Sequence, residues 1–220
     1  MSPPTQDRPR GRPKAENAPV TVDEILSAAL RAFATHGYDG VSVRTLNREL
    51  GVSHNLLNQR FGSKQGLWYA AVDSGFGNLV RDVETAYDPT LTDPLDQLGR
   101  VIRRFLEHSA FHPELLGLMN IEARQDTERL SYIYDTYIDP ATTKIGRLLE
   151  YLAAEGRIRP ISRRSFHFLI AHGAAAPFSL LPLARLFDPL DPLDPREITV
   201  HANLIAELVI SGLEERGERD

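Results

Sequence analysis

Five polar side chains fall within seven consecutive residues, and hydrogen bonding to nucleic-acid bases is the chemistry that they could perform. They are His54, Asn55, Asn58, Gln59 and Arg60. Asn and Gln can pair bidentately with adenine edges in the major groove of DNA, and His and Arg suit guanine acceptors or phosphates. The alternative for any one of them is an ordinary solvated surface. Their clustering on one short helix favours base readout.

A tight glycine turn between two short helices must position this cluster. Helices are predicted over residues 22–36, 43–50, 54–60 and about 64–87. Thr21 and Glu24 form a capping box at the first start, and Ser42, Ser53 and Ser63 suit the N-caps of the second, third and fourth helices. Gly51 suits the left-handed residue that ends the second helix. Two short helices around such a turn are a helix-turn-helix.

A basic arm precedes the helices, and residues 1–19 are predicted to be disordered without DNA. Its core is the run Pro9-Arg10-Gly11-Arg12-Pro13, followed by Lys14. The run resembles an AT-hook core, in which arginines enter the narrow minor groove of A·T-rich DNA. A disordered basic tail without preferred geometry explains the same residues, and the sequence leaves both interpretations open.

The stretch from residue 21 to 68 resembles the N-terminal domain of TetR-type transcriptional regulators. The matching segments are Ile25-Leu26-Ser27-Ala28-Ala29, residues 33–40, Ser42-Val43-Arg44, Gly51-Val52-Ser53 and Phe61-Gly62-Ser63-Lys64 with Leu67. The resemblance implies a homodimer that binds double-stranded operator DNA and has a helical C-terminal domain for a small-molecule effector. It also implies that Lys64 contacts phosphate and that Ser42, Arg44 and Thr45 meet the DNA backbone.

The chain departs from the family pattern at four positions. It has Asn55 in place of the usual Gly, Asn58 in place of an aromatic Tyr, Arg60 in place of His, and Asn47 in place of a small apolar residue. These departures predict an operator outside the commonest consensus. The candidate DNA-binding residues are Arg10, Arg12, Lys14, Ser42, Arg44, Thr45, Ser53, His54, Asn55, Asn58, Gln59, Arg60 and Lys64.

Charge is divided unevenly along the chain. The net charge of the whole chain is −5, but residues 1–66 carry nine Lys and Arg against six Asp and Glu, while residues 67–220 carry 16 against 24. A basic head on an acidic body turns one end of the molecule toward DNA. The chain has no Cys, which excludes disulfides and thiolate metal sites. No apolar stretch has the length of a signal peptide or a bilayer span, so we expect a soluble, cytoplasmic protein.

The remaining two thirds of the chain also read as helices. They are predicted over about 94–112, 113–125, 127–154 with a kink at Asp139-Pro140, 162–187, and 195–215 after a Pro/Asp linker. The fold class is therefore all-α, with about nine helices. We expect a helix-turn-helix domain over 20–66 and a ligand-binding and dimerisation domain over 67–220.

The last two predicted helices are candidates for a dimer interface, because one is rich in small residues and the other has a wide apolar stripe. Both could equally pack within their own domain, and the family resemblance favours the interface. The candidate residues are Gly173, Ala174, Phe178, Leu204, Ile205, Leu208 and Val209. A two-fold dimer predicts a palindromic operator.

Aromatic, Met and polar residues within the body are candidates for an effector pocket. They are Trp68, Phe76, Phe105, His108, Met119, Asn120, Tyr134, Tyr137, His167 and His172. For any one of them, plain core packing is the more common role. Gly75 and Gly77 lie inside the fourth predicted helix, where they could let it bend or pack closely.

Signatures of catalysis are missing, so the sequence predicts neither an enzyme, a metal site nor a cofactor. His108 and His112 lack the intervening Glu of a zinc-protease helix. His167 and His172 are five residues apart, which is a poor spacing for one α-helical face. The favoured function is a sequence-specific, ligand-responsive DNA-binding regulator, with repression as the expected sign. The alternative is a small-molecule-binding protein or enzyme with an incidental helical head.

Overall fold

The computed structural model describes residues 20–187 and 189–214, and over these ranges the fold is all-α, as predicted. A single antiparallel bridge between Ile158 and Glu214 is the exception to helix and loop in the described ranges. Within the same ranges, no helix has both the length and the apolar character needed to cross a bilayer.

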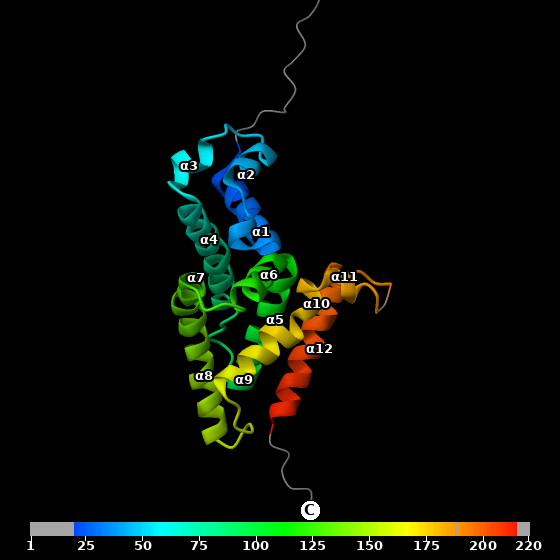
Figure 1. The fold of residues 1–220 in the computed structure, drawn as a ribbon. Coiled ribbons are helices and arrows are strands. Elements are labelled where there is room, and N and C mark those ends of the chain that lie inside the picture. The colour runs from blue at the N-terminus through cyan, green and yellow to red at the C-terminus, as the bar shows by residue number, and fades with distance from the viewer. Residues whose placement is uncertain (1–19, 188, 215–220) are drawn as a thin grey trace, which may run out of the picture.

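Three helices form a head at one end of the molecule (Figure 1). They are α1 (Val22–Gly40), α2 (Val43–Glu49) and α3 (Leu56–Phe61); α1 and α3 pack on α4 (Lys64–Glu84), and α2 packs on α1 and α3. Their shared core contains the fully buried side chains of Ile25, Phe33, Leu57 and Trp68.

Local caps fix most of the helix starts in the head. The amide of Glu24 donates to Thr21 Oγ1 at 3.2 Å, and the Thr21 amide donates to Glu24 Oε2 at 2.7 Å, which confirms the capping box. Ser63 Oγ accepts from the Gly66 amide at 3.0 Å at the start of α4, also as predicted. The predicted end of the first helix at Gly37 is confirmed, because the backbone there is non-helical (φ 69°, ψ 170°). A separate short helical segment follows this kink and carries α1 to Gly40.

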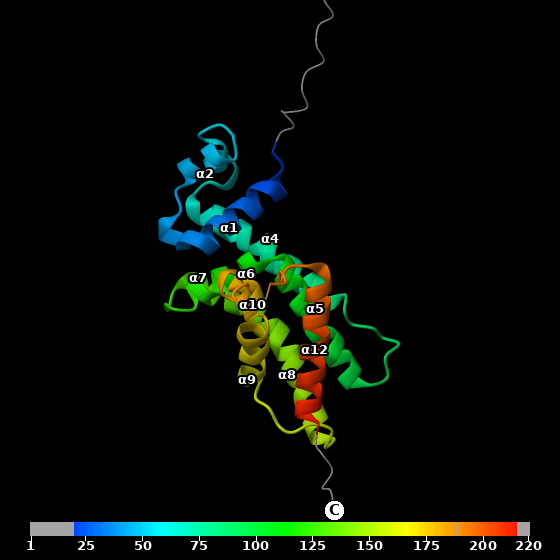
Figure 2. The ribbon, with the colours of Figure 1, turned by 90° about the vertical axis from the view of Figure 1, so that its right-hand side faces the viewer.

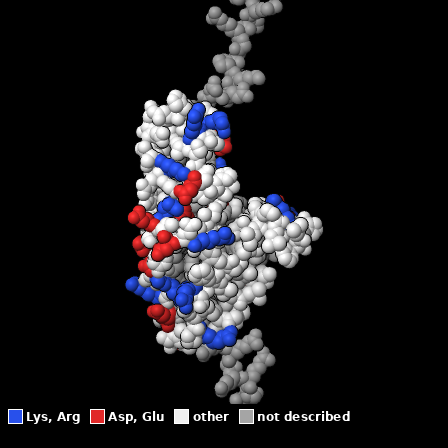
Figure 3. Space-filling model, viewed as in Figure 1, with Lys and Arg blue, Asp and Glu red and all other residues white. Residues whose placement is uncertain are grey.

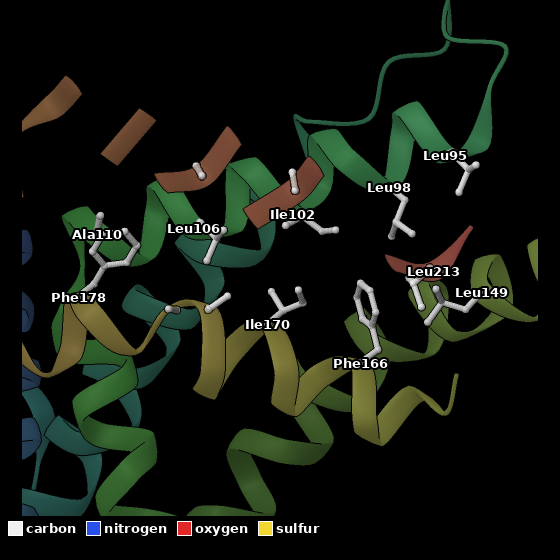
Figure 4. Close-up of a cluster of buried hydrophobic side chains, with 14 of the residues drawn as sticks. Leu95, Leu98, Ile102, Leu106, Ala110, Leu149, Phe166, Ile170, Phe178 and Leu213 are labelled. Carbon is white, nitrogen blue, oxygen red and sulfur yellow. The ribbon is translucent and has the colours of Figure 1, made fainter. Parts of the chain in front are cut away.

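The body is built from the remaining helices. These are α5 (Pro94–Phe111), α6 (Pro113–Glu122), α7 (Glu128–Ile133), η1 (Tyr134–Ile138), α8 (Asp139–Ala154), α9 (Arg163–Phe168), η2 (Leu169–Ala174), α10 (Ala176–Ser179), α11 (Leu181–Ala184) and α12 (Pro195–Leu213). The long helices α5 and α12 lie side by side, which Figure 2 shows from the side of α12. The core of the body lies between α5, α8, α9 and α12 (Figure 4).

Two of the long predicted helices are divided into segments. The helix predicted over 127–154 contains the π-helical segment η1 directly before Asp139-Pro140, where the kink was expected. The helix predicted over 162–187 is broken into α9, η2, α10 and α11. Pro177 and Pro182 lie in the first turns of the two last segments, and each lacks the amide that would continue the preceding helix. The number of helices is therefore larger than the nine predicted.

Helix α4 joins the head to the body and passes very close to both at Gly75. A Cβ atom at this position would lie 2.6 Å from Leu30 Cδ2 of α1 and 2.8 Å from Leu115 Cδ2 of α6. Real Cβ atoms do not approach that closely, so Gly75 permits the close packing of three helices. This outcome matches one of the two roles considered for the glycines of this helix.

Candidate nucleic-acid interface and internal cavity

The turn between α2 and α3 is longer than the sequence suggested. Gly51 is left-handed (φ 65°), as expected, but α3 begins at Leu56 rather than at residue 54. The prediction that Ser53 caps this helix is wrong, because the N-cap is Asn55 and its side chain makes no cap bond. The Leu56 amide bonds the Ser53 carbonyl instead, which adds a separate turn and places His54 before the helix.

Asn47 holds this turn from inside the head. Its side chain is 1% exposed. The Asn47 Nδ2 group donates to the Val43 carbonyl at 3.0 Å and to the His54 carbonyl at 3.1 Å. Asn47 Oδ1 accepts from the Leu57 amide at 3.3 Å. One amide therefore ties α2, the turn and the first turn of α3 together. The sequence marked Asn47 only as a departure from a usual apolar residue, and that departure was the signal for this role.

The predicted base-reading side chains all lie on the outside of the head. His54, Asn55, Asn58, Gln59 and Arg60 are exposed, and so is Ser53. Within the described part of the chain, the side chains of these six residues make no hydrogen bond and no ion pair. Leu57, between them, is buried in the head core. The result is a free polar edge on a rigidly anchored short helix.

The residues expected to touch the DNA backbone flank this edge. Ser42 is exposed at the N-cap of α2, where its Oγ accepts from the Thr45 amide at 3.4 Å, and Arg44 is exposed beside it. The Lys64 ammonium donates to the Asp39 carbonyl at 3.3 Å and lies 4.7 Å from the centre of the Tyr38 ring. Figure 3 shows basic side chains on the head. The arm residues Arg10, Arg12 and Lys14 lie outside the described residues.

A cavity of about 630 Å³, partly open to solvent, lies in the body and is lined by α4, α5, α6, η1, α8 and the α9–η2 segment. Of the candidate pocket residues, Phe76, Phe105, Met119, Tyr137, His167 and His172 line it. Most of the other lining side chains are aliphatic, among them Leu79, Val83, Val101, Ile145 and Leu148. Aliphatic residues carry no pattern that separates a cavity wall from a solid core, so the sequence could not single them out.

Four candidate pocket residues lie elsewhere. Trp68 is fully buried in the head core, and Asn120 lies on α6 without lining the cavity. Tyr134 is 42% exposed, and its hydroxyl accepts from Arg163 at 3.3 Å. His108 faces a separate surface depression between α4 and α5, with its Nδ1 2.8 Å from Asp82 Oδ2. Burial lowers the pKa of His108, although the hydrogen bond to Asp82 opposes that shift.

Two histidines that the sequence set apart are brought together by the π-helical segment η2. The ring centres of His167 and His172 are 5.9 Å apart, and both side chains line the cavity. Hydrogen bonds in a π-helix run from i to i+5, so a five-residue spacing places two side chains on one face. The expectation that this spacing separates them is therefore wrong. Burial lowers the pKa of both imidazoles.

Tyrosines tie the cavity wall to α4. The hydroxyls of Tyr132 and Tyr137 donate to Asp73 Oδ1 at 2.6 and 2.7 Å. Desolvation and these hydrogen bonds raise the pKa of Tyr132 to about 12 and also raise the pKa of Tyr137. Both groups are hydrogen-bond donors at neutral pH, so Tyr132 holds α7 and Tyr137 holds η1 against α4 as structural contacts.

The candidate dimer residues divide into two sets. Ala174 and Phe178 are buried in the core of their own body, and Ile205 and Val209 are partly buried against it. Gly173, Leu204 and Leu208 are exposed. Further exposed apolar side chains that the sequence did not single out are Phe168, Leu169, Leu180, Leu183, Leu186, Phe187 and Val200. Figure 3 shows few charged side chains over α9, α10 and α12 on the face in view.

Comparison with known proteins gives matches along most of the chain. Two family descriptions match: "Bacterial regulatory proteins, tetR family" over residues 25–71, and "Tetracyclin repressor-like, C-terminal domain" over residues 94–209. The chain is 31% identical over 127 residues to the HTH-type transcriptional regulator BetI of Agrobacterium fabrum, covering 56% of this chain and 61% of that protein. It is 43% identical over 98 residues to the HTH-type transcriptional repressor AcnR of Corynebacterium diphtheriae, covering 44% of this chain and 46% of that protein.

Solved structures share the fold. The ketosteroid transcriptional regulator KstR2 of Mycobacterium tuberculosis superposes with a TM-score of 0.70 at 20% identity, over 92% of this chain and 99% of that one. The TetR family regulator PfmR of Thermus thermophilus superposes with a TM-score of 0.62 at 22% identity, over 91% and 100%. The chain spans about six tenths of the length of the curated BetI relative, whereas these structural matches extend over nearly the whole of both chains.

Proposed function

This chain belongs to the tetR family of bacterial regulatory proteins, and on that premise we propose that it is a sequence-specific, DNA-binding transcriptional regulator. It acts as a dimeric, effector-responsive repressor on a palindromic operator. The observation that carries the proposal is the free polar edge of the head, from Ser53 to Arg60. The relative AcnR bears the name of a repressor, which supports the sign of regulation.

The chemistry of this edge suits base readout in the major groove. Asn55, Asn58 and Gln59 each offer an amide that can donate and accept together, which is the pattern that an adenine edge presents. Arg60 and His54 supply donors for guanine acceptors or phosphates. Ser42, Arg44, Thr45 and Lys64 surround the edge and are proposed to bind the DNA backbone, which fixes the register of the head but carries no sequence information. Arg10, Arg12 and Lys14 are proposed to add contacts from the arm.

A dimer follows from the uncovered apolar face of the body. Leu204 and Leu208 of α12 are 50% and 59% exposed, and Phe168 of α9 is 57% exposed. Large apolar patches on a protein surface mark interaction sites. Two-fold pairing through this face is proposed to set the two heads roughly 34–36 Å apart, which is one turn of a DNA duplex.

The cavity is proposed to hold the effector. It shares α4 with the head, since Phe76 lines the cavity and Gly75 packs against α1. An effector that binds one inclination of α4 better than another changes the spacing of the two heads and therefore the affinity for DNA. The effector can act only through the difference between its affinities for the two inclinations of α4.

Selection of bound duplexes from random oligonucleotides tests the DNA-binding proposal. We expect enrichment of a palindromic motif, and recovery of no motif refutes the proposal. Asn55→Ala with Asn58→Ala should lower affinity for the enriched site by roughly 1–3 kcal/mol per lost base contact while binding to unrelated DNA persists. Gln125→Ala is the matched control, because Gln125 is an exposed amide between α6 and α7, outside the head. Replacing Arg10 and Arg12 should instead weaken binding to every sequence and reduce its salt dependence.

A further inference from the structure

The polar groups that line the effector cavity differ in whether they already have partners. Four of them are occupied by hydrogen bonds within the chain: Gln97 to the Ala86 carbonyl, Ser109 to Phe105, Thr142 to Ile138, and Tyr137 to Asp73. A ligand gains little from groups whose hydrogen-bonding capacity is already used. These four side chains therefore shape the wall rather than recognise an effector.

The charged groups along the cavity are paired as well. Lys144 Nζ lies 2.8 Å from Glu84 Oε1, and the guanidinium of Arg163 lies 2.7 Å from Asp139 Oδ1. Arg163 also donates to Thr143 and Tyr134. Arg163, Lys144 and Glu84 line the cavity, and each of these three groups has an oppositely charged partner beside it.

Among the polar lining side chains that are not exposed to solvent, His167 and His172 are the exception. Both are half-buried and line the cavity, and across the described ranges their rings make only ring-to-ring contacts, with no hydrogen bond to the protein. The π-helical geometry of η2 places the two rings on one face. Two imidazoles side by side offer two N–H donors toward one acceptor group.

The rest of the cavity suits an elongated hydrocarbon. Along α5 the lining extends from Pro94 to Ser109, which is about 22 Å of helix axis. Over that length the opposite walls contribute mainly aliphatic side chains, such as Val83 from α4 and Leu148 from α8. A molecule that fills this space buries apolar surface along its whole length, and each methylene group contributes to affinity.

We propose that the effector is an elongated apolar molecule with a single carboxylate-type head, and that His167 and His172 bind the two oxygens of that head. This inference rests on the proposed effector-binding function and names the chemical class that the site accepts. A carboxylate suits the site better than an ammonium group, because each imidazole can donate a hydrogen bond to it, whereas the charged groups of the wall are already paired with one another. A neutral alcohol uses only part of this donor pair.

Proton uptake is a further consequence. Burial, with His172 and the Arg163 guanidinium as neighbours, lowers the pKa of His167, and burial also lowers the pKa of His172. The other charged groups along the wall, Glu84 and Lys144, neutralise each other. A bound carboxylate beside the rings favours their protonated form, so binding draws a proton from the buffer.

The test is calorimetric titration of the full chain near neutral pH with three ligands of equal chain length: decanoate, decanol and decyltrimethylammonium. We expect decanoate to bind roughly ten- to a hundredfold more tightly than decanol, because the two imidazoles would donate hydrogen bonds to its charged carboxylate. We expect the cation to bind most weakly. Repeating the titration in buffers of different ionisation enthalpy should reveal the proton uptake.

Variants separate the role of the two rings from their contribution to packing. His167→Leu with His172→Leu should bring decanoate affinity down to that of decanol. His167→Gln with His172→Gln keeps a hydrogen-bond donor at each position but removes the titratable imidazoles. This variant should therefore retain part of the preference for the carboxylate and lose the proton uptake. His112→Leu is the control, because His112 is largely exposed and lies outside the cavity.

The outcomes separate this inference from the proposed function. Equal binding of the three ligands, preference for the cation, or a carboxylate preference that survives the double leucine variant overturns the inference. If none of the ligands binds while operator DNA is still selected, the effector class is wrong and the DNA-binding function stands. If no operator is selected, the proposed function fails, whatever the calorimetry shows.

Discussion

Replacing Asn47 with alanine should both destabilise the protein and lower its affinity for operator DNA. The change removes the two Nδ2 hydrogen bonds to the Val43 and His54 carbonyls and the Oδ1 acceptor of the Leu57 amide. Leu57 lies in the first turn of α3, where backbone amides have no partner within the helix. In the variant its buried amide has no replacement for the lost acceptor.

The magnitude follows from these three bonds. An unpaired buried amide costs about 1–3 kcal/mol, and a typical hydrogen bond contributes about 1 kcal/mol net. Because the His54 carbonyl lies in an exposed turn, water can replace part of what it loses. We therefore expect Asn47→Ala to lower the free energy of unfolding by about 2–4 kcal/mol, measured by urea titration. Asn47→Asp should lower it further, because the site is 1% exposed and holds two carbonyls that would face a carboxylate.

Operator binding supplies the second readout. The turn that Asn47 holds carries His54 and leads directly into Asn55 and Asn58, so its loosening should reduce operator affinity even under conditions where the variant is fully folded. Asn58→Ala is the companion variant, because Asn58 is exposed, so its loss should reduce affinity with little change in stability. If the free energy of unfolding of Asn47→Ala lies within about 0.5 kcal/mol of that of the unsubstituted protein, and the variant binds the operator normally, the role given to Asn47 is wrong.

Three further changes probe the rest of the molecule. Gly75→Ala should lower the free energy of unfolding, measured by urea titration, by about 1–3 kcal/mol, because the new Cβ atom would overlap the buried side chains of Leu30 and Leu115. This loss should exceed the gain from the higher helix propensity of alanine, so a stabilised variant would contradict the close packing. Leu204→Arg with Leu208→Arg should convert a dimer to a monomer in analytical ultracentrifugation, since both side chains are exposed on α12; an unchanged mass would place the interface elsewhere. The free energy of unfolding should fall as the pH drops below about 6.5, because the pKa values of His108, His167 and His172 are lowered in the folded protein. Below that pH the unfolded chain binds more protons than the folded one, which favours unfolding. A urea midpoint that is equal at mildly acidic and mildly alkaline pH would argue against this.

Features that depend on neighbouring residues alone could be predicted from the sequence. The capping box at Thr21, the caps at Ser42 and Ser63 and the left-handed turn at Gly51 all appear in the structure. Each depends on hydrogen bonds or dihedral angles within a few residues, so the local sequence determines it. The residues of the free polar edge could be predicted for the same reason, since they lie within one short segment of the sequence.

Features that depend on tertiary contacts could not be predicted. The start of α3 is set by Asn47, which bonds residues 7 and 10 positions further along the chain. The side of α12 that faces a partner was also ambiguous, because its apolar stripe is wide enough to serve two surfaces. The small residues Ala202 and Ala206 are fully buried and face α5, which turns Leu204 and Leu208 outward. Which half of the stripe is buried depends on where α5 lies.

The pairing of His167 with His172 shows how a helix type alters what a spacing means. On an α-helix, positions five apart point in different directions, but the π-helical segment brings both rings to the cavity. The segment also sets where the proposed effector head lies in relation to α4. On α4, Phe76 touches the cavity and Gly75 touches α1, while Asp73 receives the hydroxyls of Tyr132 and Tyr137. Cavity wall and head therefore meet within four residues of one helix. An effector that shifts this turn of α4 through Phe76 therefore also shifts the contact between Gly75 and α1.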